Sequence, residues 1–161
     1  MEISKEVKRE AFYRGGLAVN TGYKWSLAVI QLGHVSDSGQ FMKLLKEHVK
    51  KYDGHVPADI VMKGELVNEL YIFMMDDYEK CAVTLGSLFG GAGFGTSIPK
   101  NLSIDAGVGV AQFKPGMSLA DLVKEARELR IDYQIGELPE YTIERIPEPR
   151  KIVKDALSKV G

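Results

Sequence analysis

The chain has 161 residues, of which 45% are apolar, and a formal net charge of −1. It can therefore bury the core of one folded domain, and it lacks the general positive charge that nucleic-acid binding favours. Its single cysteine, Cys81, excludes an intramolecular disulfide and a zinc site built from cysteines. The charged first residues, and the lack of an apolar run near the ~18 residues of a membrane span, favour a cytoplasmic protein with neither membrane nor nucleic-acid partners.

The first segment predicts a short helix. Ser4 can cap this helix, and Gly15 with Gly16 would end it. A strand over residues 11–19, turned by residues 20–22, is the competing interpretation, and we prefer the helix.

The following segment predicts a strand, a helix and a hairpin. Residues 25–32 are apolar, partly β-branched and bounded by glycines, which indicates a strand. Residues 41–52 place apolar side chains at helical spacing with lysines opposite, which indicates an amphipathic helix. Residues 58–63 and 66–75 predict the two strands of a hairpin. The apolar run 70–75 does not alternate, so both faces of this strand should be covered.

The centre of the chain predicts a helix, a glycine-rich loop and a strand. Asp76 suits the N-cap of the helix, with Glu79 as its capping partner, and the apolar stripe of the helix ends at Phe89. Glycine-rich residues 90–97 follow, and residues 102–113 then alternate as a strand. One face of this strand is bulky and the other is nearly bare, which permits close approach of a helix, a backbone or a ligand.

The last part predicts a helix, a strand and a helix. Ser118 caps the first helix, residues 141–146 form the strand, and residues 147–161 hold a C-terminal amphipathic helix. The chain is expected to be a single α+β domain, residues 1–161, with residues 1–22 as an N-terminal extension.

Together these elements predict a two-layer α+β sandwich, ferredoxin-like or palm-like, with helices packed on a mainly antiparallel sheet. An unpaired edge of that sheet can pair with another chain. This edge and an exposed Trp25 predict a homo-oligomer.

From Trp25 onward the order of elements is similar to the palm fold of the nucleotidyl cyclases, which include the GGDEF diguanylate cyclases and archaeal GTP cyclohydrolase III. The likeness lies in an apolar hairpin strand that ends at Asp76-Asp77 before a helix. It also lies in the strand Leu-Ser-Ile-Asp-Ala-Gly-Val-Gly-Val-Ala, at residues 102–111, which leads to a loop and a Ser-Leu-Ala-Asp-Leu helix. The resemblance implies a palm-like sheet and a nucleotide site at its strand ends.

The metal site of that family is not preserved. Where the family has a metal-binding carboxylate at the end of the first strand, this chain reads Gln31-Leu32-Gly33-His34, and the nearest acid is Asp37. Where the hairpin turn of the family carries Gly-Gly-(Asp/Glu)-Glu-Phe, this chain reads Lys63-Gly64-Glu65-Leu66. A two-metal mechanism needs several converging carboxylates, so cyclase activity is not expected.

The glycine-rich loop is the strongest candidate for ligand contact. Its backbone amides could cradle an anion, and its hydroxyls and a following lysine could add contacts. The predicted ligand-binding residues are Gly91, Gly93, Gly95, Thr96, Ser97 and Lys100. This loop follows a helix and precedes a strand, which is not the context of the common phosphate loops. A helix C-cap with a connector, or an oligomer contact, is the alternative.

Four residues are candidates for catalysis. Asp76 and Asp77 stand at a strand end, where α/β sheets often bind ligands, although helix capping alone explains one of them. Asp105 lies on the bare strand face as a ligand, a base or a structural ion-pair partner. His34 lies in a turn beside a strand end, as a general base or an ordinary turn histidine.

Three other side chains have structural and functional interpretations. Tyr13 and Arg14 could stack on a base or grip a phosphate, but such residues more often pack a terminal helix onto a sheet. Cys81 falls on an apolar helix stripe, which indicates a buried and inert thiol.

We therefore expect binding or turnover of a phosphorylated small molecule, a nucleotide or pterin-like compound, at the glycine-rich loop beside the strand-end carboxylates. A metal, if one takes part, would be Mg²⁺, because Mg²⁺ commonly accompanies phosphates. The alternative is a non-catalytic oligomeric or regulatory domain, in which the bare strand face packs against a helix or a second subunit. A bound nucleotide-sized molecule would favour the first hypothesis, and a ligand-free oligomer the second.

Overall fold

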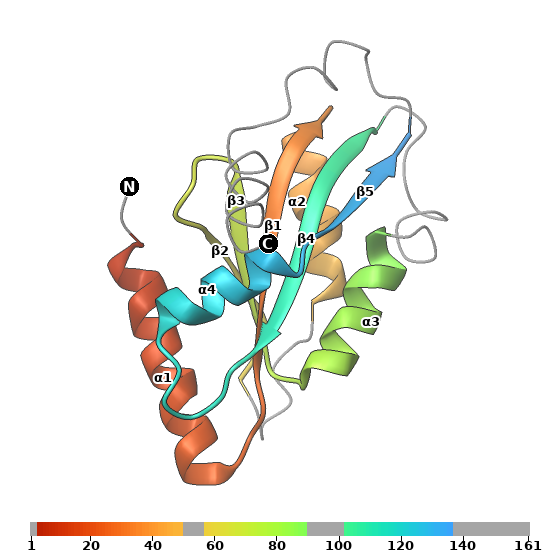
Figure 1. Cartoon of the computed structure of the whole chain (residues 1–161). Coiled ribbons are helices and arrows are strands. Elements are labelled where there is room, and N and C mark those ends of the chain that lie inside the picture. Colours follow the sequence, from red (N-terminus) through yellow and green to blue (C-terminus); the bar gives the residue numbers. More distant parts are fainter. Residues whose placement is uncertain (1–2, 50–56, 90–101, 137–161) are drawn as a thin grey trace, which may run out of the picture.

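The computed structural model describes residues 3–49, 57–89 and 102–136, and it forms a five-stranded sheet with four helices (Figure 1). The helices and strands, in chain order, are α1 (Lys5–Thr21), β1 (Ser26–Val35), α2 (Ser38–His48), β2 (Ile60–Lys63), β3 (Glu69–Met74), α3 (Tyr78–Phe89), β4 (Ile104–Gln112), α4 (Leu119–Glu128) and β5 (Ile131–Ile135).

The sheet has the strand order β2-β3-β1-β4-β5, and every pair of neighbours is antiparallel. The first four strands, with α2 and α3 between them, form the two interleaved β-α-β units of the ferredoxin-like arrangement. β1 is the central strand, and Ser26 pairs with Met74 of β3 on one side and with Gln112 of β4 on the other. The predicted α+β fold with an antiparallel sheet and packed helices is confirmed.

Helices cover both faces of the sheet, so the sheet has a hydrophobic core on each side. Phe41 and Leu45 of α2 and Leu85 of α3 belong to one core, and Val7 of α1 and Leu122 of α4 belong to the other. Figure 1 shows α4 in front of the strands and α2 behind them. These two cores explain why the apolar run of β3 does not alternate, because each of its faces meets a layer of helix.

Helix α1 continues through the two glycines that were predicted to end it. Ser4 caps it as predicted, but the helix ends only at Thr21, where Gly22 adopts a left-handed conformation with φ of 75°. A Cβ atom on Gly15 would lie 3.4 Å from the ring of Phe113, so Gly15 lets this helix lie close to the chain that follows β4. The competing strand over residues 11–19 is wrong.

The caps of α2 and α3 are both aspartates. The Asp37 carboxylate accepts the backbone N–H of Gln40 at 3.0 Å and caps α2. At α3 the predicted cap, Asp76, is wrong by one residue, because the carboxylate of Asp77 accepts the N–H of Lys80 at 2.9 Å. The helix therefore begins one residue later than the sequence pattern predicts.

The alternation predicted for β4 is confirmed, and its bare face packs against α4. A Cβ atom on Gly109 would collide with the backbone carbonyl of Ala126 in α4, so only glycine fits at this position. Ser118 caps α4 as predicted, by accepting the N–H of Asp121 at 3.1 Å. β5 was not predicted, and the strand and helix predicted within residues 141–161 lie outside the described residues.

Trp25 is buried, which corrects the prediction that it is exposed. Only 1% of its surface is accessible, and its ring stacks on Phe113 with a centroid distance of 4.9 Å. Arg14 of α1 is buried nearby, donates to the carbonyl of Ala58 at 2.6 Å and lies over the ring of Phe73. Arg14 therefore packs α1 onto the sheet, which is the structural interpretation of this residue.

Candidate functional site

The four predicted catalytic residues lie at opposite ends of the central strand. Asp76 lies beside the start of β1, where its backbone carbonyl accepts the Ser26 hydroxyl at 2.9 Å. His34 pairs with Asp105 at the other end of β1. Eight residues of strand at about 3.4 Å each separate these ends, so the four residues cannot form one site.

The described residues that follow the glycine-rich segment lie at the His34 end of the sheet. The carbonyl of Ser103 accepts the N–H of Ser36 at 3.0 Å. The predicted ligand-binding residues, Gly91, Gly93, Gly95, Thr96, Ser97 and Lys100, lie outside the described residues.

At the His34 end, the predicted catalytic side chains are engaged within the fold. The His34 Nε2 atom lies 3.0 Å from the Ser103 hydroxyl. Asp105 is 2% exposed, and a Cβ atom on Gly33 would collide with its carboxylate. The pairing of β1 with β4 has a bulge between Leu32 and His34, at Gly33. Beyond this bulge β1 continues to Val35, past its predicted end.

At the opposite end, Asp76 and Asp77 line a recess of about 340 Å³ that also contains Lys24 and Lys80. Asp77 caps α3, so the capping interpretation accounts for its carboxylate. The recess is wide and open, and its two lysines offset its two aspartates.

One polar constellation in the described part of the chain was not predicted from the sequence. The buried carboxylate of Glu69 accepts two hydrogen bonds from Arg127, at 2.9 and 2.7 Å, and a third from the Gln31 side chain at 3.2 Å. Burial alone would lower the pKa of Arg127, but the hydrogen bonds and charge of Glu69 outweigh it and raise that pKa. This bidentate pair joins α4 to the sheet.

The constellation continues along the same face of the sheet. Arg130 donates to the Gln31 side-chain oxygen at 3.1 Å and pairs with Asp132 at 3.2 Å. Burial, and next the charge of Glu69, raise the pKa of the Tyr71 phenol, which accepts the N–H of Glu65 at 3.3 Å. These groups satisfy one another, as expected for a network that positions structure. Glu69 and Arg127 lie far apart in sequence, so no local spacing reveals them.

A second recess lies on the opposite face of the sheet, between α2 and the edge strand β2. This α2–β2 recess has a volume of about 340 Å³ and mostly apolar walls. Its lining residues are Leu32, Ser38, Phe41, Met42, Lys46, Val61, Met62, Lys63 and Leu70. Lys46 and Lys63 are exposed at its rim, and Phe41 in its wall also contacts the ring of Phe89, which precedes the glycine-rich loop.

Cys81 is buried on α3, as predicted, and burial raises the pKa of its thiol to about 12. Since the thiolate is the reactive form, we expect the native protein to react with iodoacetamide at mildly alkaline pH at least about a hundredfold more slowly than the unfolded chain. Mass spectrometry of the alkylated product measures both rates at this single cysteine. Equal rates in native and denaturing buffer would contradict the burial of the thiol.

Within residues 3–49, 57–89 and 102–136, no three histidine, cysteine, aspartate or glutamate side chains are placed to hold a metal ion. In the same residues, no helix is both long enough and apolar enough to cross a membrane. No protein-family model, curated protein or solved structure matches the chain.

Proposed function

We propose that the chain binds a small phosphorylated molecule with a flat ring, a nucleotide or pterin-like compound, in the α2–β2 recess. The observation that carries this proposal is an apolar recess with two exposed lysines, Lys46 and Lys63, at its rim. Ligand sites commonly combine apolar walls with a few polar groups that fix orientation.

The two parts of such a ligand match the two parts of the recess. Met42, Val61 and Leu70, which are only partly buried, offer apolar contact to a planar ring. The ammonium groups of Lys46 and Lys63 offer charge-assisted hydrogen bonds to phosphate oxygens. A second hollow beside the recess is lined by Lys43, again by Lys46, and by Glu47, so lysines outnumber acids two to one there.

Binding, rather than turnover, is supported by the engagement of the acidic groups. Both oxygens of Glu69 accept hydrogen bonds from Arg127, and Asp77 caps α3. Neither carboxylate reaches the recess lining. Mg²⁺, where the ligand requires it, would enter with the phosphates. The predicted contacts of the glycine-rich loop stay a prediction, as does a cytoplasmic location.

The test is calorimetric titration of the protein with guanosine and adenosine mono- and triphosphates, with and without Mg²⁺. The double variant Lys46→Ala/Lys63→Ala is expected to weaken binding of the best ligand by about 10- to 100-fold, because each lost charged contact contributes about 1.5–3 kcal/mol before screening at an exposed rim. The matched control is Lys80→Ala/Lys124→Ala, which removes two exposed lysines outside the recess and should leave the affinity unchanged.

Equal weakening in both double variants would mean that general positive charge, and not the recess, attracts the phosphates. No binding of any compound in the panel to the wild-type protein would overturn the proposal. Added salt should weaken binding, since the lysines are exposed.

A non-catalytic oligomeric or regulatory domain is the second candidate. One observation favours it: α1 exposes apolar side chains, among them Phe12 at 85% and Val19 at 65%. A protein surface that carries such residues together commonly contacts a partner.

A further inference from the structure

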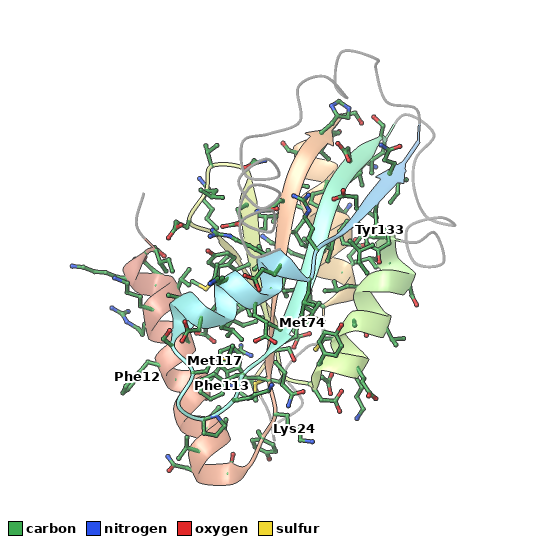
Figure 2. All side chains as sticks on the ribbon, viewed as in Figure 1. Phe12, Lys24, Met74, Phe113, Met117 and Tyr133 are labelled. Carbon is green, nitrogen blue, oxygen red and sulfur yellow. The ribbon has the colours of Figure 1, made fainter. Side chains whose placement is uncertain are left out.

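A large apolar groove runs between α1 and the segment that joins β4 to α4. This α1 groove has a volume of about 500 Å³, and its lining is almost entirely apolar. Trp25, Phe113 and Met117 lie in it, and Figure 2 shows Phe113 and Met117 beside α1. It lies on the sheet face opposite the α2–β2 recess, so the proposed ligand does not use it.

One stripe of α1 borders the groove. On this stripe an exposed aromatic side chain, Phe12 (the projection), lies next to an unfilled glycine position, Gly16 (the notch). Phe12, Gly16 and Val19 fall at helical spacing and all line the groove. Phe12 is 85% exposed and projects from the helix (Figure 2). A Cβ atom on Gly16 would meet nothing within 4 Å, so an open notch lies one helical turn from an exposed aromatic ring.

We propose that a second copy of this chain occupies the α1 groove, with the two α1 helices antiparallel about a twofold axis. The projection and the notch lie on one surface, so such an axis would bring Phe12 of each copy over Gly16 of the other. An isologous interface requires this kind of self-complementary surface. The inference gives the second candidate function an interface and a partner.

The charges of α1 favour an antiparallel over a parallel arrangement. Every charged residue of α1 lies between Lys5 and Arg14, and the rest of the helix, residues 15–21, has none. An antiparallel pair therefore sets the charged half of each helix against the uncharged half of the other. Lys8 would then face the negative C-terminal end of the other helix, which has no basic residue of its own. A parallel pair would instead oppose Lys8 to Lys8.

The experiment is sedimentation velocity of the full chain over a range of concentrations. One helix pair with its groove makes a small interface, so we expect a monomer–dimer equilibrium at about micromolar concentrations. Phe12→Glu and Gly16→Glu should each shift the chain to monomer by at least about tenfold in Kd. The matched control is Val83→Glu, at a 68% exposed position on α3, which should leave the equilibrium unchanged.

The arrangement itself is tested with the double variant Phe12→Cys/Gly16→Cys. Under oxidation it should form a disulfide-linked dimer, whereas the wild-type chain, with its buried Cys81, should not. A wild-type chain that is monomeric at every concentration would overturn the proposal, and so would a dimer that persists in both glutamate variants. Since the groove and the recess lie on opposite faces, the dimer and the ligand site can fail independently.

Discussion

Replacing Arg127 by methionine is expected to lower the free energy of unfolding by about 3–5 kcal/mol, because the variant leaves a buried carboxylate without its charged partner. The Glu69 side chain has no accessible surface, whereas Arg127 is 18% exposed. Removal of the arginine therefore leaves the more deeply buried member of the pair unpaired. Urea denaturation followed by circular dichroism measures the change.

The double variant Glu69→Gln/Arg127→Met should recover part of this loss, since it removes the buried charge together with its partner. The two positions are then expected to couple by about 2 kcal/mol in a double-mutant cycle. Arg9→Met, at an exposed position on α1, is the control and should change stability by at most about 0.5 kcal/mol. Additive effects of the Glu69 and Arg127 variants would contradict the role of the pair.

Gly109→Ala is expected to destabilise the fold by about 3 kcal/mol, because the new methyl group has no room. A Cβ atom at this position would collide with the backbone carbonyl of Ala126, and a helix backbone cannot rotate away as a long side chain can. The helix α4 would have to move away from the sheet. Thermal or urea denaturation measures this loss.

Gly86→Ala is the matched control, because it makes the same substitution inside α3, where a Cβ atom would lie 3.7 Å from the Tyr133 hydroxyl, an ordinary contact. Alanine favours a helix over glycine by roughly 0.5–1 kcal/mol, so this variant should be more stable than the wild-type chain. If Gly109→Ala were neutral, α4 could not pack as closely on β4 as the structure places it.

The periodic elements could be predicted from the sequence because their pattern reflects burial directly. The alternation of residues 102–113 correctly gave a strand with one core face and one bare face, and β4 runs from Ile104 to Gln112. The Ser118 cap of α4 and the buried Cys81 were also predicted, since both follow from neighbouring residues.

The errors in the fold arose where distant packing overrides a local signal. Gly15 and Gly16 suggest a helix end, but α1 continues because Gly15 lies close against Phe113. Trp25 was predicted to be exposed, but the ring of the same Phe113 stacks on it. Both contacts join residues that are far apart in the sequence.

The candidate site was harder to predict because it depends on the register of the strands. Asp76 and Asp105 both stand near strand ends, and only the pairing of β1 with β3 and β4 shows that these ends are opposite. The α2–β2 recess combines a helix with a strand that follows it later in the chain, and its lysines resemble ordinary surface residues in the sequence. No motif marks such a combination.

The central position of β1 has a consequence for the protein during its synthesis. β1 is completed at Val35, but its second neighbour, β4, is completed only at Gln112. At about 5–20 residues per second, the ribosome needs roughly 4 to 15 seconds to make the chain between these points. For that interval one edge of an apolar strand is without its partner. The nascent chain should therefore engage chaperones that recognise extended apolar segments, and its refolding should be slow compared with that of helical proteins of similar length.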